Sequence, residues 1–177
     1  DFPPNVRMVR ITNDELYARI AAALSSDPRG SPATGAGLRG DLDEGFDLRA
    51  ALQVLLEEQP YMLVELKPVL GVIFRDLVAN YSHWGYADID TVVGNPAAFL
   101  TPHILRNYDV YTASFGDTYR YYMRGQLTIH RNDPYVSNMW RSCSSLNTLV
   151  ERLKGYMRRR RAIAVSHVDA KAEWRFV

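Results

Sequence analysis

The sequence has little of several features that would mark particular classes of protein. Cys143 is its only cysteine, so no disulfide can form within the chain and no zinc cluster can be built from thiolates. No hydrophobic run in it is long enough to span a bilayer. Positive and negative side chains nearly balance, at a net charge of +1. We therefore expect no nucleic acid as a partner, because charge gives no reason for one.

The rest of the composition is that of an ordinary folded domain. The 177 residues are 47% hydrophobic and 23% charged, and a chain of this length forms one domain with a substantial core more readily than two. Eleven Tyr and three Trp residues are present, many of them between Tyr108 and Trp140. Rings with polar tips often line partly wet pockets. We expect residues 1–177 to form a single domain or part of one.

Strand and helix patterns alternate along the chain and indicate an α/β domain. Residues 5–12 alternate as a strand does, and Thr12 and Glu15 have capping-box spacing before an amphipathic helix. Residues 26–46 are rich in Gly, Pro, Ser and Asp, which predicts a flexible loop. The later predicted elements are helices at 47–59 and 68–81, a strand at 83–94, short helices after Asn95 and Thr101, strands at 108–115 and 119–132, helices from Asp133 to 161, and a tail at 162–177 that is part strand.

The strand predicted at 83–94, "HWGYADIDTVVG", contains two carboxylates, Asp88 and Asp90. Residues i and i+2 of a strand point to the same face, so the two like charges would stand side by side. A divalent cation, protonation or wide solvent exposure would relieve the repulsion. A calcium loop of the EF-hand kind is excluded, because Thr91, Val92 and Val93 supply none of its further ligands.

Two enzyme families and a solvated strand end remain as explanations of this pair. "DIDTV" fits the Asp-x-Asp-x-Thr/Val signature of haloacid-dehalogenase-type phosphotransferases, in which the first Asp is the nucleophile and the second an acid/base. That family expects an apolar strand before the motif and an acidic pair downstream, and this sequence has neither. The Asp-x-Asp of nucleotide-sugar glycosyltransferases with a GT-A fold is the other explanation.

A longer stretch carries the second resemblance. "LKPVLGVIFRDLVANYSHWGYADIDTVVGNPAAFLTPHILRNYDVYTA", followed by "GQLTIHRN", resembles a family of GT-A glycosyltransferases found in polysaccharide assembly. The family pattern is Lys-Pro on a helix, then "WGY-D-D-GD---FLT---L--YDV", then a strand that begins at Gly and ends in Arg-Asn. The resemblance covers about residues 65–145.

This resemblance implies a GT-A-like, Rossmann-like mixed sheet flanked by helices. It also implies transfer of a sugar from a nucleotide-sugar donor to a hydroxyl of a carbohydrate or glycoconjugate acceptor. Asp88 and Asp90 would hold Mn²⁺ or Mg²⁺ on the donor diphosphate, with Lys67 and Trp84 near the donor. The strand from Gly125 to Asn132 would border the acceptor cleft. Asn95 stands where relatives often have Asp.

Three further residues complete the predicted site. Many enzymes of this fold add a late His or Asp to the metal, and "SHVDAKAE" offers His167 and Asp169. Asp117 is a candidate general base for the acceptor hydroxyl. For each of these, a plain loop or tail residue is the competing interpretation.

The start of the chain suggests a second class of function. Residues 5–12 resemble a later strand of the GT-A family, so we expect the base-binding portion to be missing or supplied by a partner chain. A non-catalytic module that keeps this fold within a larger assembly is therefore the alternative to an enzyme. The cellular location stays open between a secretory lumen and the cytoplasmic face of a membrane.

Overall fold

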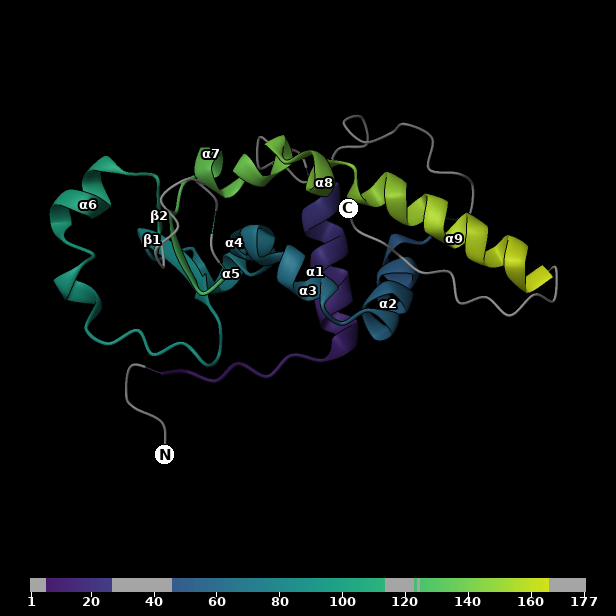
Figure 1. Cartoon of the computed structure of the whole chain (residues 1–177), viewed down its shortest axis with the longest axis horizontal. Coiled ribbons are helices and arrows are strands. Elements are labelled where there is room, and N and C mark those ends of the chain that lie inside the picture. Colours follow the sequence, from purple (N-terminus) through teal and green to yellow (C-terminus); the bar gives the residue numbers. More distant parts are fainter. Residues whose placement is uncertain (1–5, 27–45, 114–122, 124, 166–177) are drawn as a thin grey trace.

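The computed structural model describes residues 6–26, 46–113, 123 and 125–165. Helices fill the centre and one end of the molecule, and a small sheet with the short helix α6 forms the other end (Figure 1). Helices α4 and α5 lie between the sheet and α1 (Figure 1).

The first two long helices begin where the sequence predicts. Helix α1 spans Asn13–Ser25, and the Thr12 hydroxyl accepts a hydrogen bond from the Glu15 N–H at 3.1 Å. Helix α2 spans Leu48–Glu58, and the Asp47 carboxylate accepts from two N–H groups of its first turn. These side chains satisfy donors that a helix start leaves without partners.

The core is built by one apolar face from each long helix. Helices α1 and α2 pack against each other and α2 packs against α9, which spans Leu149–Val165. Ile20, Leu52 and Leu153 are fully buried where these faces meet. The other fully or nearly fully buried core residues of these helices are Tyr17, Ala23, Leu24, Ala51, Leu55, Leu56, Leu149 and Tyr156.

The segment after α2 forms short helical pieces instead of the long helix predicted from Pro68. Phe74 interrupts it, with φ −114° and ψ 32°. Gly71 and the β-branched residues around it have low helix propensity, so packing decides the local geometry here. The pieces are α3 (Met62–Glu65), the 3-10 helix η1 (Lys67–Val69), α4 (Leu70–Ile73) and α5 (Arg75–Val78).

Three strands form one antiparallel sheet in the order β1-β3-β2. On its buried face Trp84 pairs with His130, and Tyr86 pairs with Thr128. This alternation of buried and more exposed residues is typical of a sheet that faces the core on one side. The strands are β1 (His83–Ala87), β2 (Val110–Thr112) and β3 (Leu127–Arg131).

Three of the remaining helical elements begin at the predicted prolines. Asn95, Thr101 and Asp133 each accept a hydrogen bond from a backbone N–H of the helix that follows, and proline occupies the first turn of each. These three elements are the 3-10 helix η2 (Pro96–Ala98) and the helices α6 (Pro102–Asn107) and α7 (Pro134–Ser137). The 3-10 helix η3 (Met139–Ser142) and the helix α8 (Ser144–Asn147) follow α7 and begin without a proline.

Two strand predictions are wrong. Residues 6–12 form no strand, because no described strand lies alongside to pair with them. The strand predicted at 83–94 ends at Ala87. Beyond it Ile89 and Val92 are 105% and 94% exposed, so their apolar side chains face solvent and do not join a sheet.

The fold class is confirmed at the coarse level, as a mixed α/β structure that is mostly helical. The part of the chain that the structure describes contains no parallel sheet, so the predicted Rossmann-like sheet is not observed there. Helix α9 continues to Val165, through the first residues of the tail that was expected to be part strand. Residues 27–45 of the predicted loop, and 166–177 of the tail, lie outside the described residues.

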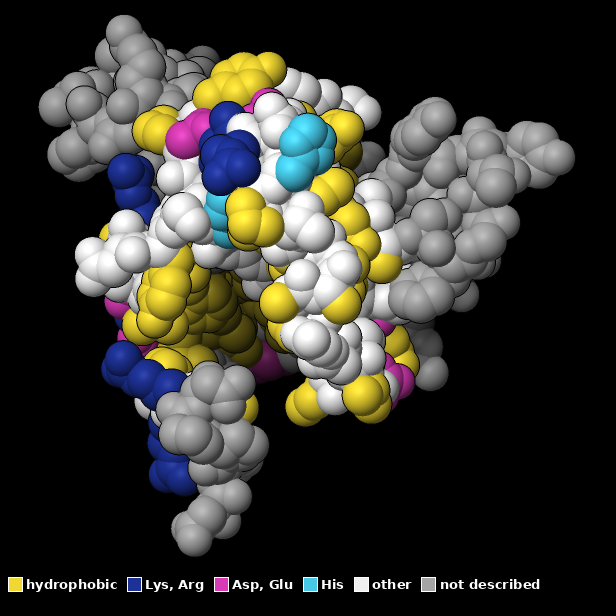
Figure 2. All heavy atoms as spheres, turned by 90° about the vertical axis from the view of Figure 1, so that its left-hand side faces the viewer, with side chains coloured by type: hydrophobic (Ala, Val, Ile, Leu, Met, Phe, Trp, Pro, Cys, Tyr) yellow, Lys and Arg dark blue, Asp and Glu magenta, His cyan; other side chains and the backbone are white. Residues whose placement is uncertain are grey.

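The surface at the sheet end is uneven in both shape and chemistry. Seen from that end, hydrophobic side chains line a hollow, and basic side chains lie below it (Figure 2). Among the described helices, none combines the length and apolar character needed to cross a bilayer.

Candidate functional site

Asp88 lies where β1 ends and a turn begins. Its N–H donates to the Gln126 carbonyl at 3.3 Å, which continues the ladder beyond the last strand pair. Its carbonyl then accepts from the Thr91 N–H at 3.0 Å, which closes a turn over Ile89 and Asp90. The predicted side-by-side placement on one strand is therefore wrong, because Asp90 is the third residue of a turn.

Lys67 meets Asp88 across the fold. Its ammonium forms an ion pair with Asp88 Oδ1 and donates to the Gly125 carbonyl at 3.1 Å. The Lys67 side chain is 15% exposed and that of Asp88 is 35% exposed, so water screens this pair only in part. The 3-10 helix η1 and the end of β1 thus bring together two residues of the predicted site.

Gly125 leaves room for this contact. A Cβ built on it would lie 3.3 Å from Lys67 Nζ and 3.9 Å from each carboxylate oxygen of Asp88. A larger side chain at position 125 would compete with the ammonium for the same space. Sequence reasoning placed Gly125 at the start of a strand near the site, and the structure adds its contact with Lys67.

The charges of the cluster do not cancel. Lys67 compensates Asp88, whereas Asp90 is exposed and has no ion-pair partner within the described ranges. The Lys67 ammonium also lies 5.9 Å from the ring centroid of Tyr86, a distance at which a cation and an aromatic face still attract. Burial raises the pKa of Tyr86. The end of β1 thus has an ammonium paired with the Asp88 carboxylate, and the exposed carboxylate of Asp90 follows two residues later in the turn.

Trp84 does not join this cluster. It is 6% exposed, and its ring stacks on that of His130, with centroids 4.3 Å apart and an angle of 7° between the planes. Trp84 is the second residue of β1, four positions before Asp88, and it faces the interior. Its contacts in this structure are packing contacts, and its expected place near the donor stays a prediction.

Asn95 and two histidines of the sheet, His83 and His130, have structural roles in the fold. Asn95 caps η2 through its side-chain oxygen, which accepts from the Ala97 N–H at 3.2 Å. His83 makes a 3.2 Å contact between Nε2 and the Leu105 carbonyl. His130 is 3% exposed, and burial lowers its pKa to about 4. A neutral, buried imidazole is consistent with packing and not with a metal ligand on the surface.

Three predicted site residues lie outside the described residues: Asp117, His167 and Asp169. Their proposed roles therefore stay predictions. Within the ranges that the structure does describe, no three side chains of His, Cys, Asp or Glu gather as a metal centre would require. A cation at Asp88 and Asp90 would need ligand oxygens from water or from a bound diphosphate.

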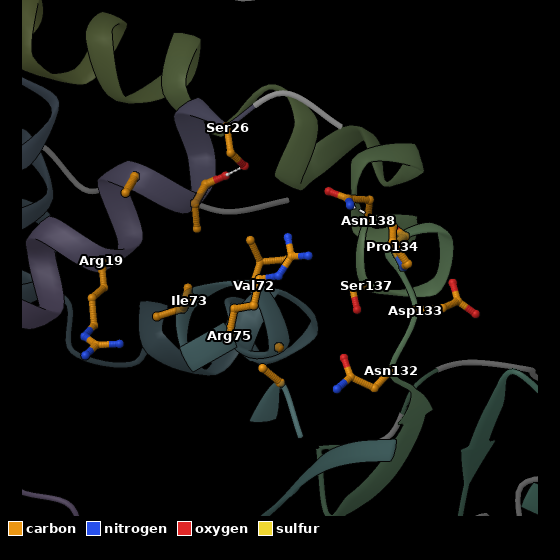
Figure 3. A pocket seen from close by; sticks show the side chains of 14 residues that line it. Arg19, Ser26, Val72, Ile73, Arg75, Asn132, Asp133, Pro134, Ser137 and Asn138 are labelled. Atoms are coloured by element: carbon orange, nitrogen blue, oxygen red, sulfur yellow. Dashed lines mark hydrogen bonds between the residues drawn. The ribbon is translucent and has the colours of Figure 1, made fainter. Parts of the chain in front are cut away.

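A separate cavity of about 390 Å³ lies among α1, α4, α5 and α7 (Figure 3). Arg75 and Ser137 are among its lining residues, and neither Lys67 nor Asp88 is. No sequence motif marks it, because the lining residues come from segments far apart in the chain.

Residues 40–162 match a family of unknown function, DUF6625. The chain belongs to that family. The DUF6625 region contains Lys67, the Asp88–Thr91 turn and Gly125, and it ends before His167 and Asp169. Helix α1, which contributes to the separate cavity, also lies outside it. No curated protein and no solved structure matches the chain.

Proposed function

We propose that this member of DUF6625 is a GT-A-like glycosyltransferase that moves a sugar from a nucleotide-sugar donor to an acceptor hydroxyl. One observation carries the proposal: Lys67 and Asp88 are in contact at the end of β1, and Asp90 follows in the adjoining turn. A donor diphosphate is stabilised by positive charge, and its metal ion is held by carboxylate oxygens. This cluster offers both kinds of group.

The side chains of the turn fit a hard divalent cation. Carboxylate oxygens are the ligands that Mg²⁺ and Mn²⁺ prefer, and Asp90 is exposed and free to bind. When bound, Mn²⁺ or Mg²⁺ would neutralise charge on the departing diphosphate. Asp88 and Asp90 would hold the ion, and the Lys67 ammonium would face the phosphate oxygens. Lys67 would have to share or release Asp88 as the donor binds.

Asp117, His167 and Asp169 complete this proposal. Asp117 would accept the proton of the acceptor hydroxyl, which an inverting transferase requires. His167 or Asp169 would add a ligand to the cation, because two carboxylates leave a divalent ion under-coordinated. The strand β3 would border the acceptor cleft.

The finer fold assignment is also part of the proposal. It rests on the resemblance over residues 65–145. The strands of the described residues pair only in antiparallel fashion and therefore give it no support of their own. A complete GT-A-like sheet needs parallel strands in addition to these. A partner chain that supplies them, together with the base-binding portion, would complete the enzyme.

The alternative is a non-catalytic module within a larger assembly. The ion pair between Lys67 and Asp88 favours it, because an ammonium already compensates the carboxylate that a metal would need. The lesser alternative, a haloacid-dehalogenase-type phosphotransferase with Asp88 as nucleophile, has less support. In that reaction the Asp88 carboxylate would have to attack the substrate while it is paired with Lys67.

Thermal unfolding with Mn²⁺ tests the proposal. In the presence of UDP or GDP, a bound cation should raise the melting temperature by roughly 5 °C at saturation. Asp90→Asn should remove most of this shift. Asp14→Asn is the matched control, because it also removes one exposed carboxylate but lies in the first turn of α1.

The result also separates the two main functions. A melting temperature indifferent to Mn²⁺ with both nucleoside diphosphates would remove the transferase proposal and favour the module. If the shift occurs, incubation with a panel of nucleotide sugars should release nucleoside diphosphate, and Asp90→Asn should lower that release at least about tenfold.

A further inference from the structure

The cavity among α1, α4, α5 and α7 contains a cation that lacks a counter-charge. Arg75, the first residue of α5, is exposed, and no described residue forms an ion pair or hydrogen bond with its side chain. In Figure 3 its guanidinium points into the space between the end of α1 and α7. An unpaired guanidinium there attracts negative charge.

The second arginine of the cavity, Arg19, already has carboxylate partners. Arg19 donates to both oxygens of Asp76, at 2.6 and 3.0 Å, and its Nε donates to Glu15 at 3.0 Å. These hydrogen bonds raise the pKa of Arg19 and lower that of Asp76. Figure 3 shows the Arg19 guanidinium turned away from Arg75. Arg19 therefore stabilises the edge of the cavity, and its charge, compensated by two carboxylates, adds little attraction for an anionic ligand.

Among the described residues that line the cavity, Asp133 is the one acid, and it forms no ion pair with Arg75. Asp133 uses its carboxylate to cap α7, where it accepts from the Val136 N–H at 2.9 Å. Its side chain points away from the centre of the cavity (Figure 3). Arg75 thus keeps its positive charge toward the interior.

Polar and apolar groups line the cavity together with Arg75, as they do in small-molecule sites. Ser137 is half-buried, and within the described chain its hydroxyl has no hydrogen-bond partner, so it remains available as a donor. The amide of Asn132 is fixed by two hydrogen bonds of 2.7 Å, to the carbonyls of Val78 and Tyr81. Val72 adds apolar surface. At about 390 Å³ the cavity falls within the size range of ligand pockets.

We propose that this cavity binds a small molecule through an oxyanion group, a carboxylate or a phosphate, held by Arg75 and Ser137. A guanidinium presents paired N–H donors that match the two oxygens of such a group. The Ser137 hydroxyl adds a third donor, and the apolar wall takes the body of the ligand. The site is distinct from Lys67 and Asp88 and does not depend on the proposed transferase function.

NMR titration of the full chain tests the site with two probes, inorganic phosphate and acetate, at constant ionic strength. We expect saturable shifts of backbone amides confined to the cavity lining, around residues 71–75 and 132–138. Saturation by phosphate alone identifies a phosphate group as the ligand feature. Saturation by acetate alone identifies a carboxylate, and saturation by both supports the shared chemistry.

Three variants make the test specific. Arg75→Gln should raise the dissociation constant about tenfold, the effect expected for the loss of a charge-assisted bidentate contact. Arg75→Lys should raise it less, because the charge remains and the paired geometry is lost. Arg159→Gln, the matched control, removes an exposed arginine from α9 and should leave binding unchanged.

A cavity-filling variant gives an independent measurement. Ala22 lines the cavity from an exposed position on α1, and leucine is a good helix former, so Ala22→Leu should keep the fold and lower the affinity for either probe. The proposal is overturned if neither probe gives saturable shifts at the cavity, or if Arg75→Gln binds as tightly as the unmodified chain.

Discussion

The indole of Trp84 and the imidazole of His130 stack almost in parallel, with ring centroids 4.3 Å apart and planes 7° apart. The two residues are cross-strand partners of β1 and β3. Neither ring nitrogen of His130 has a hydrogen-bond partner among the described residues. The indole N–H of Trp84 has none there either. The imidazole is therefore stable in this position only while it is neutral.

This pairing predicts a dependence of stability on pH. Burial lowers the pKa of His130 to about 4, from an ordinary value of 6.5. Between these values the unfolded chain binds a proton at this residue and the folded chain does not. The contribution of His130 is therefore complete above pH 6.5 and is lost as the pH falls toward 4, by about 3 kcal/mol in all. Urea unfolding across this pH range measures it.

His130→Phe is the matched variant for this prediction, because phenylalanine stacks on Trp84 but does not titrate. Its free energy of unfolding should change with pH less steeply than that of the unmodified chain between pH 6.5 and 4. Equal slopes for the two chains would show that His130 is not the group responsible.

Two helical glycines should respond to alanine in opposite ways. A Cβ at Gly71, in α4, would lie 2.2 Å from Cε2 of the buried Trp84 ring, so the ring or the helix must move. We expect Gly71→Ala to lower the free energy of unfolding by about 1–3 kcal/mol, as overpacking does. At Gly155, in α9, the nearest atom would lie 3.6 Å away, at the end of Arg159.

Gly155→Ala should therefore stabilise the chain by about 0.5–1 kcal/mol, because alanine has the higher helix propensity. Chemical denaturation of both variants checks the pair. If Gly71→Ala were as stable as the unmodified chain, Trp84 would not be packed against α4 as described.

Local signals predicted the helix starts well. Thr12, Thr101 and Asp133 accept the capping hydrogen bonds that their positions suggest. A cap depends on residues within three positions of each other, so the sequence contains all the information that it needs. The family resemblance assigned Lys67 and Asp88 to one site, but it did not predict their ion pair, which joins residues 21 positions apart.

Features that depend on distant neighbours were not predictable in this way. Residues 6–12 alternate as a strand does but have no described strand beside them. The helix expected from Pro68 breaks at Phe74, and the Trp84 ring lies close against Gly71 in the preceding piece. Arg75 resembles any helix surface residue until the fold places it at a cavity. Tertiary packing overrides propensity at each of these places.

The cap at α2 gives a direct test of such a local signal. Asp47 accepts from the N–H groups of Arg49, at 2.9 Å, and Ala50, at 3.2 Å. Asp47→Ala should lower the free energy of unfolding by about 1 kcal/mol, whereas Asp47→Asn keeps an acceptor oxygen and should cost much less. Urea unfolding compares the three chains. An asparagine variant as unstable as the alanine variant would mean that charge, and not the hydrogen bonds, stabilises this helix start.

The ion pair of Lys67 with Asp88 supplies the prediction closest to the proposed function. Lys67→Met keeps the apolar stem and removes the charge. Without the ammonium, Asp88 loses its partner, so the free energy of unfolding should fall by about 1–2 kcal/mol. The same change should affect two ligands in opposite directions, because the ammonium repels a metal ion and attracts a diphosphate.

If the transferase proposal holds, Lys67→Met should bind Mn²⁺ alone about tenfold more tightly and UDP about tenfold more weakly, since one charge a few ångströms away changes each affinity by that order. Electron paramagnetic resonance measures free Mn²⁺, and calorimetry measures UDP binding. Asp88→Asn is the companion variant, and it should weaken Mn²⁺ binding whether or not nucleotide is present. A purely structural ion pair would lower stability in Lys67→Met and leave both affinities unchanged. That outcome would assign Lys67 to the scaffold and favour the non-catalytic module, since the ammonium would then serve neither the metal ion nor the diphosphate.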